Sequence, residues 1–339
     1  MTHQNVARIP GTSRIRPSSL RGHSAARWEC SPNSSHMGTP YLENPWQTRG
    51  MLRVMTFNIL HDSVRNLSPA WKTRRPLVTA TIQSADADVV LLQEVSPRQL
   101  EDLVLDLPEY EFVPGAMSGG TRFPSWASSL EGIAWHILGD FVGRGEQCPI
   151  LVRKGRAACL EHGSFWVSPR HDESGRPWYP LPTPHIVTWA RIEVSTGLIC
   201  AVYSTHLGIL PWTAGHTAKA LLAILDRNWS GEPQILAGDF NSLHDWPLVR
   251  SLTANRNPGP PAFRDAWLEA RSEEGVGTTF HWGFGLPGPR IDYILVRPRC
   301  QIPTAMTSGA ASGRAFPSDH FALTADLQLE TQRDSEELV

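Results

Sequence analysis

Residues 236–242 read LAGDFNS and are the most informative stretch of this chain. An apolar run from Gln234 to Gly238 leads into Asp239 and Asn241. A short apolar run that stops at Gly and Asp predicts a buried strand with two polar side chains at its end. Taken singly, such a tetrapeptide more often forms an Asx turn than a site. Its meaning therefore depends on the rest of the chain.

Five further segments repeat the pattern of an apolar run that meets a carboxylate, an amide or an imidazole. They are MTFNIL with Asn58, LLQEV with Glu94, YSTHLG with His206, RIDYILV with Asp292, and PSDHFAL with Ser318, Asp319 and His320. Strands hold residues rigidly at one rim of a sheet, so groups far apart in sequence converge on a small volume. Because six such segments are hard to obtain by coincidence, we expect one shared site.

These residues are donors for a hard cation. They combine carboxylates, amides and imidazoles without a cysteine, which suits Mg²⁺ or Mn²⁺, whereas a soft metal recruits thiolates. Cleavage of a phosphate ester needs a cation on the phosphoryl oxygens, a water made nucleophilic and turned in line, and donors for the developing charge. The six segments supply all three, and the sequence therefore predicts a metal-dependent phosphoesterase.

Strand-length apolar runs alternate with helix-like stretches along the chain. Strands are expected at residues 52–59, 89–93, 150–153, 186–193, 198–205, 234–238, 291–296 and 321–329, and helices at 70–84, 96–106 and 213–228. This order predicts an α/β or α+β domain. Pro- and Gly-rich stretches at 168–184 and 255–261 are expected to be long surface loops.

Residues 1–50 differ from the rest in composition. They hold six of the 31 basic and two of the 33 acidic residues, among much Ser, Pro and Gly, and little of this can build a core. We expect a disordered leader or one misassigned from an early start codon, since Met51 lies just ahead of the first strand; a transit peptide has a similar composition. Residues 51–330 are expected to form one catalytic domain, and 331–339 a polar C-terminal tail.

The composition also excludes some classes of protein. No stretch approaches the roughly 20 apolar residues of a membrane helix, and no secretory signal is visible. Five scattered cysteines without a CxxC pair fit a reduced compartment. We expect a soluble cytoplasmic protein, or an organellar one if residues 1–50 are a transit peptide. Residues 51–339 carry a net charge of −6, which argues against strong non-specific binding of long polyanions.

The six motifs also carry a family resemblance. TFNIL, LQEV, THL, GDFN, RIDYI and SDH stand in the order and approximate spacing of the endonuclease/exonuclease/phosphatase superfamily, which the chain resembles over about residues 52–328. GEQCPILVRKGRAACLEHGSFWVSP looks like its central strand pair. The resemblance implies an α+β fold, a four-layer α/β/β/α sandwich of two packed mixed β-sheets flanked by helices. Apurinic/apyrimidinic endonucleases, pancreatic-type deoxyribonucleases and sphingomyelinases share that fold.

The resemblance implies which residues hold the cation and the substrate. Glu94 and Asp319 look like the principal ligands of Mg²⁺ or Mn²⁺, with Asn58 close by. Asn241 and His206 look like contacts to the phosphate, and Asn58 is expected near the substrate as well.

The resemblance also implies the catalytic residues. His320 looks like the imidazole beside the scissile phosphate, and Asp292 like the carboxylate that orients it. Asp239 looks like the group that positions or deprotonates the attacking water, and His206 is expected beside it. A lone imidazole near a metal and a phosphate needs a carboxylate to fix its tautomer and sustain its charge. Whether Asp239 or His320 is the base stays open.

Each residue has a structural alternative. Glu94 is also placed to favour the N-terminus of the following helix, and His206 and Asp292 are compatible with roles in packing and in a turn. Glu146, in GEQCP, matches a position where many family members carry an acid, although a loop Glu is usually just solvated. Residues that are candidates for substrate contacts are Trp126, Trp135, Trp178, Trp212, Trp282, His281 and Arg290.

Three functions are compatible with these motifs. The first is a phosphodiesterase or phosphatase acting on a small or lipid-linked ester, and the second is an endo- or exonuclease acting on DNA or RNA. The third, a non-catalytic phosphate-binding protein, is weakest because all the motif residues are present. A nuclease needs a basic groove, for which Arg144, Arg153, Lys154 and Arg156 are the candidates. We expect a monomer and favour a small phosphate ester as the substrate.

Overall fold

β1 (Met51–Asn58) and β2 (Val89–Gln93) are parallel neighbours within a seven-stranded sheet. The strand order of this first sheet is β10-β12-β13-β1-β2-β4-β3. The other strands are β3 (Tyr110–Val113), β4 (Ile150–Arg153), β10 (Ser272–Glu274), β12 (Gln301–Ser308) and β13 (Ala322–Gln328). β1 also pairs with β13, antiparallel, so the sheet joins the first and last described strands.

The second sheet has six strands in the order β5-β6-β7-β8-β11-β9. They are β5 (Ala157–Trp166), β6 (Ile186–Val194), β7 (Ile199–His206), β8 (Gln234–Asp239), β9 (Arg264–Asp265) and β11 (Asp292–Arg297). β8 lies between a parallel β7 and an antiparallel β11, and its register pairs Asp239 with His206 on one side and with Asp292 on the other. Three polar residues are thereby placed next to one another at one rim.

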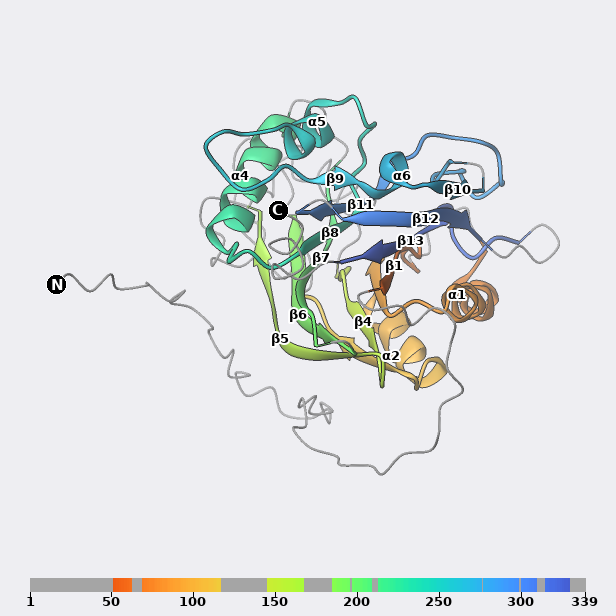
Figure 1. Ribbon diagram of the computed structural model, residues 1–339. Helices are drawn as coiled ribbons and strands as arrows, with labels where there is room; N and C mark the ends of the chain where they lie inside the picture. The colour runs from red at the N-terminus through yellow and green to blue at the C-terminus, as the bar shows by residue number, and fades with distance from the viewer. Residues whose placement is uncertain are drawn as a thin grey trace, which may run out of the picture. The chain divides into compact units, whose positions relative to one another are not determined.

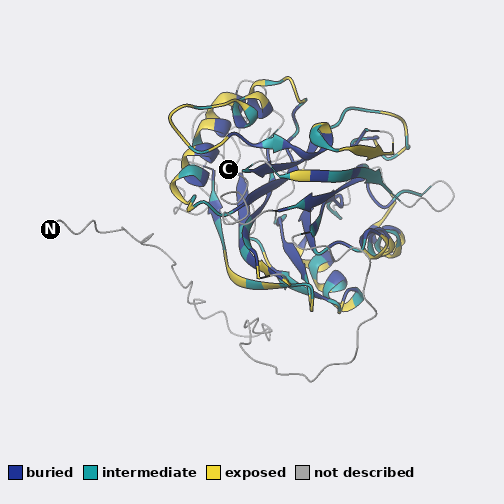
Figure 2. Cartoon of the chain, in the orientation of Figure 1, coloured by how far each residue is buried: buried dark blue, intermediate teal, exposed yellow. Residues whose placement is uncertain are grey.

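The two sheets pack face to face and helices cover both outer faces (Figure 1). Inward side chains of both sheets, such as Leu91 and Ile235, share one core. α1 (Trp71–Ala85) and α2 (Pro97–Asp106) pack on the first sheet, and α4 (Ala214–Arg227) and α5 (Pro247–Thr253) on the second. The central strands of both sheets are buried between helices that are exposed on one side, whereas the edge strands β5 and β10 are largely exposed (Figure 2). The predicted α/β/β/α sandwich is confirmed.

This computed structural model describes residues 51–62, 69–116, 145–167, 185–195, 197–208, 213–275, 277–298, 300–309 and 315–329. All of them belong to one compact unit, Pro45–Val339. The predicted leader at 1–50, the tail at 331–339 and the loop at 168–184 lie outside the described residues. No helix among those described is long and apolar enough to cross a membrane.

The first turn of α2 fixes the geometry that follows β2. Ser96 caps the helix by accepting a hydrogen bond from the backbone N–H of Gln99, and the Gln99 side chain accepts one from the N–H of Ser96. Pro97 at the first helical position has the backbone angle that a helix requires. This reciprocal capping satisfies the start of the helix, so Glu94, two residues earlier, is not needed there.

All eight predicted strands and all three predicted helices lie within one residue of their predicted bounds. The patterns did not predict β3, β9, β10 or β12, nor the short helices α5 and α6 (Ala266–Glu269), and β5 was implied only through the resemblance. β12 reads QIPTAMTS, with a proline and mixed polarity, and most of it is only partly buried. Its place is set by pairing with β13, and such tertiary pairing leaves no periodic signal in the sequence.

His185 is a buried histidine just before β6. Its carbonyl accepts a hydrogen bond from Val167 N at 2.9 Å, and its ring lies where a Cβ on Gly208 would collide with it. Burial, with a smaller contribution from the charge of His206, lowers the pKa of His185 to about 4. The folded protein therefore holds this ring neutral at every pH at which we expect it to work.

The buried ring makes the protein sensitive to acid. In the unfolded chain His185 binds a proton below a pH of about 6.5, whereas in the folded chain it does so only near its lowered pKa. Above about pH 6.5 the ring is neutral in both states, and its titration does not lower the free energy of unfolding. As the pH falls from about 6.5 toward 4, only the unfolded chain binds the proton, and the free energy of unfolding decreases. The loss is roughly 2 to 3 kcal/mol by about pH 4.5.

Urea unfolding of the wild type and of His185→Gln between about pH 7 and 4.5 measures this loss. We expect the wild type to lose more stability than the variant across that window, whatever the difference between them at pH 7. Parallel pH dependences would contradict the assignment.

Candidate active site

The six motif segments meet at one rim of the sandwich. β1 ends at Asn58, Glu94 follows β2, β7 ends at His206, β8 ends at Asp239, β11 begins at Asp292, and Asp319 and His320 precede β13. The sheets supply different members: Asn58, Glu94, Asp319 and His320 come with the first sheet, and His206, Asp239 and Asp292 with the second. The convergence expected from the sequence is therefore present.

Asp239 lies at the centre of this group. Its Oδ2 accepts a hydrogen bond from Asn58 Nδ2 at 3.0 Å and lies 3.6 Å from Nε2 of both His206 and His320. Its Oδ1 accepts the backbone N–H of Asn241 at 2.9 Å, so the Asx turn that was the structural alternative is formed as well. Burial, followed by the charge of Asp292, raises the pKa of Asp239 to about 6.

Gly238 permits the close approach of β7 and β8 at this level. Its φ is 151°, and a Cβ there would overlap the carbonyl oxygen of Thr205. Only glycine fits between the two strands. The glycine of GDFN thus lets His206 and Asp239 lie side by side at the strand ends.

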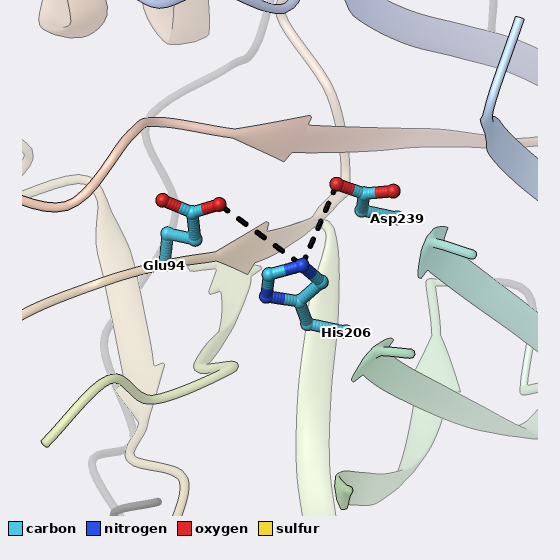
Figure 3. A group of neighbouring side chains, drawn as sticks. All are labelled: Glu94, His206 and Asp239. Atoms are coloured by element: carbon cyan, nitrogen blue, oxygen red, sulfur yellow. Dashed lines mark ion pairs between the residues drawn. The ribbon is translucent and has the colours of Figure 1, made fainter. Parts of the chain in front are cut away.

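Glu94 faces both the amide of Asn58 and the imidazole of His206. Its Oε1 accepts from Asn58 Nδ2 at 2.9 Å, its Oε2 accepts from His61 N at 3.1 Å, and His206 Nε2 lies 4.0 Å away. Figure 3 shows the two carboxylates on either side of the His206 ring nitrogen. Burial would raise the pKa of Glu94, but His206 and these hydrogen bonds outweigh it and hold that pKa below its ordinary value.

Two of the site residues have left-handed backbones. Glu94 has φ 57° and Asn241 has φ 47°, in the left-handed region that disfavours residues with a Cβ. Asn adopts this region readily, so the conformation of Asn241 fits the Asx turn. Glu94 has no such tolerance, and a strained residue of this kind at a site is one that the surrounding structure holds in place.

His206 is held between an amide and a second carboxylate. Asn241 Nδ2 lies 3.0 Å from His206 Nε2 and donates to the Leu207 carbonyl at 2.8 Å. The Leu207 carbonyl can only accept, so the nitrogen of the Asn241 amide must face it. The second N–H of that amide then donates to His206 Nε2, which acts as the acceptor. The ring proton then lies on Nδ1, 3.3 Å from Glu146 Oε1.

The charges around His206 act against this neutral form. Burial lowers the pKa of His206, but Glu146, Asp239 and Glu94 outweigh it and raise that pKa to about 10. The pKa of Glu146 is itself raised, first by burial. Hydrogen bonds thus favour a neutral ring and electrostatics favours a charged one. A positive charge beside Glu94 and Asp239 would offset their effect on His206, lower its pKa and favour the neutral ring.

His320 and Asp292 form the tightest pair of the site. His320 Nδ1 lies 2.8 Å from Asp292 Oδ2, both side chains are buried, and the ring of Phe280 lies 5.1 Å from that of His320. Burial opposes charge on His320, but Asp292 and then Asp239 hold its pKa well above the ordinary value. The pair therefore presents a charged Nε2–H toward Asp239.

Asp319 stands beside His320 with its pKa raised by burial and by the charge of Glu94. Its Oδ1 accepts from Ser318 Oγ at 3.2 Å. Arg74, which is buried, donates to the carbonyls of Ile59 at 2.5 Å and of Pro317 at 3.0 Å. This guanidinium joins the segment after Asn58 to the segment before Asp319.

The donor set fits a hard divalent cation. Oxygen and nitrogen atoms of Glu94, His206 and Asp239 lie within 4.8 Å of one another, and so do those of Asp239, Asp292 and His320. Carboxylates gathered at a buried site repel each other unless cations compensate them, and oxygen donors suit Mg²⁺ or Mn²⁺. The ligation of a cation by Asn58 stays a prediction: its Nδ2 bonds both carboxylates, and its Oδ1 accepts from Leu60 N at 3.0 Å.

Sequence reasoning gave Glu146 only a weak role, yet it lies against His206. The signals were an acid just ahead of β4 and its match to a position where many family members carry an acid. His281 is buried with its ring against Phe316 and Phe321, and the guanidinium of Arg290 pairs with Asp265 at 2.7 Å. Trp126, Trp135, Trp178 and Trp212 lie outside the described residues, whereas Trp282 is 50% exposed.

The described members of the predicted basic patch lie at the other end of the first sheet. Arg153 and Arg156 both pair with Asp86, and Arg156 also pairs with Asp88 at 2.7 Å. Lys154 donates to the carbonyl of Pro108. Arg144 lies outside the described residues. β2 begins near these pairs and ends at the site, so this group is not positioned to flank the site.

Comparison with known proteins identifies the family. A sequence model of the Endonuclease/Exonuclease/phosphatase family matches residues 55–320, and no curated protein matches the chain. The solved structure of an endonuclease/exonuclease/phosphatase from Bacteroides vulgatus is 26% identical, with a TM-score of 0.70, and the match covers 83% of this chain and 99% of that one.

Two other solved structures share the fold at lower identity. A mannosyl-6-phosphatase from Bacteroides thetaiotaomicron is 20% identical, with a TM-score of 0.63 over 82% of this chain and 100% of that chain. D. rerio TDP2, complexed with a single-strand DNA product, is 17% identical, with a TM-score of 0.56 over 82% and 99%. With the family match over most of its length, this chain belongs to the endonuclease/exonuclease/phosphatase family.

Proposed function

We propose that this protein is a divalent-cation-dependent hydrolase of phosphate esters, in which an activated water attacks phosphorus in line. The observation that carries the proposal is the setting of Asp239, whose Oδ2 lies 3.6 Å from the Nε2 atoms of both His206 and His320. The far nitrogen of each imidazole faces a further carboxylate, Glu146 or Asp292. A base flanked by two oriented imidazoles suits proton transfer at a phosphoryl centre.

The protonation states favour Asp239 as the base. With a pKa of about 6, Asp239 is mostly ionised at neutral pH and still a useful proton acceptor, since the most effective base has a pKa near the working pH. His320 is protonated under the same conditions and is kept so by Asp292. We infer that Asp239 takes the proton of the water and that His320 Nε2 donates to a phosphoryl oxygen.

Glu94 and Asp319 are the residues that we propose to hold the cation, with Asn58 beside them. Glu94 belongs to one of the two gathered donor groups. Asp319 belongs to neither, but burial and then the charge of Glu94 raise its pKa, which links the two carboxylates. A cation bound there supplies Lewis acidity to the phosphoryl oxygens and charge compensation for the leaving group. Its identity as Mg²⁺ or Mn²⁺ rests on the oxygen donors alone.

The apolar turn next to His320 favours a small substrate. Trp282, Phe284 and Leu286 are 50%, 71% and 58% exposed, and the ring of Phe280 lies 5.1 Å from both the Trp282 and the His320 rings. Exposed aromatic groups that continue into a polar site suit the organic part of a small ester. The mannosyl-6-phosphatase of the same fold acts on a sugar phosphate, as its name states.

Nucleic acid is the second candidate substrate. The D. rerio TDP2 structure holds a single-strand DNA product in the same fold. Against this stands the net charge of −6 on residues 51–339, together with the engagement of Arg153 and Arg156 by Asp86. A nuclease depends on basic contacts along the backbone of its substrate, and the described part of the chain offers few near the site.

Metal dependence is the first expectation. Excess chelator should abolish turnover, and Mg²⁺ or Mn²⁺ added beyond the chelator should restore it, because Glu94 and Asp319 provide hard oxygen ligands. Chelator saturated beforehand with the cation is the control and should leave turnover unchanged. Full activity in excess chelator would refute the proposal.

The second expectation concerns the chemical step. Asp239→Ala and His320→Ala should each lower kcat by on the order of 10²-fold or more. Asp292→Asn should be milder than Asp292→Ala, because the amide keeps a hydrogen bond but not the charge. His162→Ala, on the exposed face of β5, is the matched control. Near-normal kcat in both the Asp239 and the His320 variants, with melting curves unchanged, would argue against this mechanism.

The third expectation concerns the substrate. kcat/KM for a p-nitrophenyl phosphate ester should exceed that for plasmid DNA at matched metal and salt. Trp282→Ala should lower it for the aryl ester severalfold, whereas Leu268→Ala, on the exposed surface of α6 (Ala266–Glu269), should not. Rapid plasmid nicking that falls steeply between about 50 and 200 mM salt would instead identify a nuclease.

A further inference from the structure

Thr279 is a fully buried threonine that no motif singled out. Its Oγ1 accepts two backbone hydrogen bonds, from Ile291 N at 3.0 Å and from Asp292 N at 3.1 Å. A hydroxyl has two acceptor sites, and here both face the peptide groups that lead into β11. Asp292, the carboxylate paired with His320, begins that strand.

The backbone around Thr279 is bonded to the other half of the same pair. Its carbonyl accepts from Phe321 N at 2.6 Å, and His281 N donates to the Asp319 carbonyl at 2.8 Å. Phe280 and His320 thus form an antiparallel bridge. The segment 279–281 lies between Asp292 and His320 and is hydrogen bonded to the backbone on both sides.

The hydrogen bonds that join this segment to Asp319 and Phe321 are between backbone groups. The N–H groups of Ile291 and Asp292 instead donate to a side-chain hydroxyl. β11 joins β8 from Asp292 onward, and just before it the carbonyl of Ile291 accepts from Phe240 N. Without the hydroxyl, the buried N–H of Asp292 and the partly buried N–H of Ile291 would lose this acceptor, at a cost that drives the backbone to shift. A shift at Asp292 moves the carboxylate whose Oδ2 lies 2.8 Å from His320 Nδ1.

We propose that Thr279 is a positioning residue that sets the geometry of the Asp292–His320 pair through its hydroxyl. The effect on turnover rests on the proposed hydrolase function, whereas the effect on the pair does not. Displacing catalytic groups by about 1 Å costs up to roughly 10²-fold in rate. The hydroxyl of Thr279 therefore influences the reaction without touching the substrate.

The test uses variants that separate the hydroxyl from the shape of the side chain. Thr279→Val keeps the shape and removes the acceptor, and Thr279→Ser keeps the acceptor. The neighbouring Thr278 is the matched control, because it is also buried and its hydroxyl bonds to the backbone of Gly288 instead. We expect kcat to fall about tenfold or more in Thr279→Val, with KM little changed, and to stay close to wild type in Thr279→Ser and Thr278→Val.

A second readout does not need activity. The proton on His320 Nδ1, held toward Asp292, should give a far-downfield NMR resonance, assigned by its absence in His320→Gln. We expect Thr279→Val to shift or remove this resonance, and Thr279→Ser and Thr278→Val to keep it. If Thr279→Val does not fold, Thr279→Cys provides a weak acceptor and should fall between the Ser and Val results.

The outcomes are distinct. The proposal is overturned if a folded Thr279→Val has wild-type kcat and an unchanged resonance; Thr279→Cys takes its place if Thr279→Val does not fold. Equal losses of kcat in Thr278→Val and Thr279→Val would also overturn it. If the wild type hydrolyses no phosphate ester, the proposed function fails, and the resonance alone then decides the role of Thr279.

Discussion

The amide of Asn58 is the constraint on which the site depends. It is buried, it comes from the first sheet, and its Nδ2 bonds both Glu94 beside it and Asp239 at the end of the second sheet. A buried amide between two carboxylates satisfies charges that would otherwise be costly to hold in the interior. The same bonds fix how the two sheets lie at the rim. A shift of one sheet over the other would separate the carboxylates from their shared donor.

Around this amide the charges follow a repeated arrangement. Each imidazole turns one nitrogen toward Asp239 and the other toward its own carboxylate, Glu146 for His206 and Asp292 for His320. The outer carboxylates sustain charge on the rings, and burial keeps Asp239 basic. The two imidazoles differ in their hydrogen bonds. Asn241 donates a hydrogen bond to Nε2 of His206, whereas the contact described for Nε2 of His320 is the ion pair with Asp239. We therefore assign the donor role to His320.

The sequence predicted the strands of the sandwich and the meeting of the six motif segments at one rim, because both leave local signals. Apolar runs marked β1, β2 and β8 within a residue, and polar groups at their ends marked the rim. The resemblance supplied the layer order, which runs of apolar residues do not encode. Glu146 matched an acidic position of the family but was underestimated, because a loop Glu is usually solvated and its partner, His206, is distant in sequence. Thr279 and Arg74 left no signal, since backbone atoms are their partners and any residue type supplies those.

The pairing of β1 with β13 has a consequence for how the protein is made. Met51 lies opposite Gln328, so the central strand of the first sheet gains its second neighbour from the far end of the domain. A chain that emerges from the ribosome N-terminus first holds Asn58 and Glu94 long before Asp319 and His320 exist. Contacts between such distant segments form slowly. A nascent chain would therefore carry an open sheet edge along β1, and a site without Asp319 and His320, until synthesis of the domain is complete.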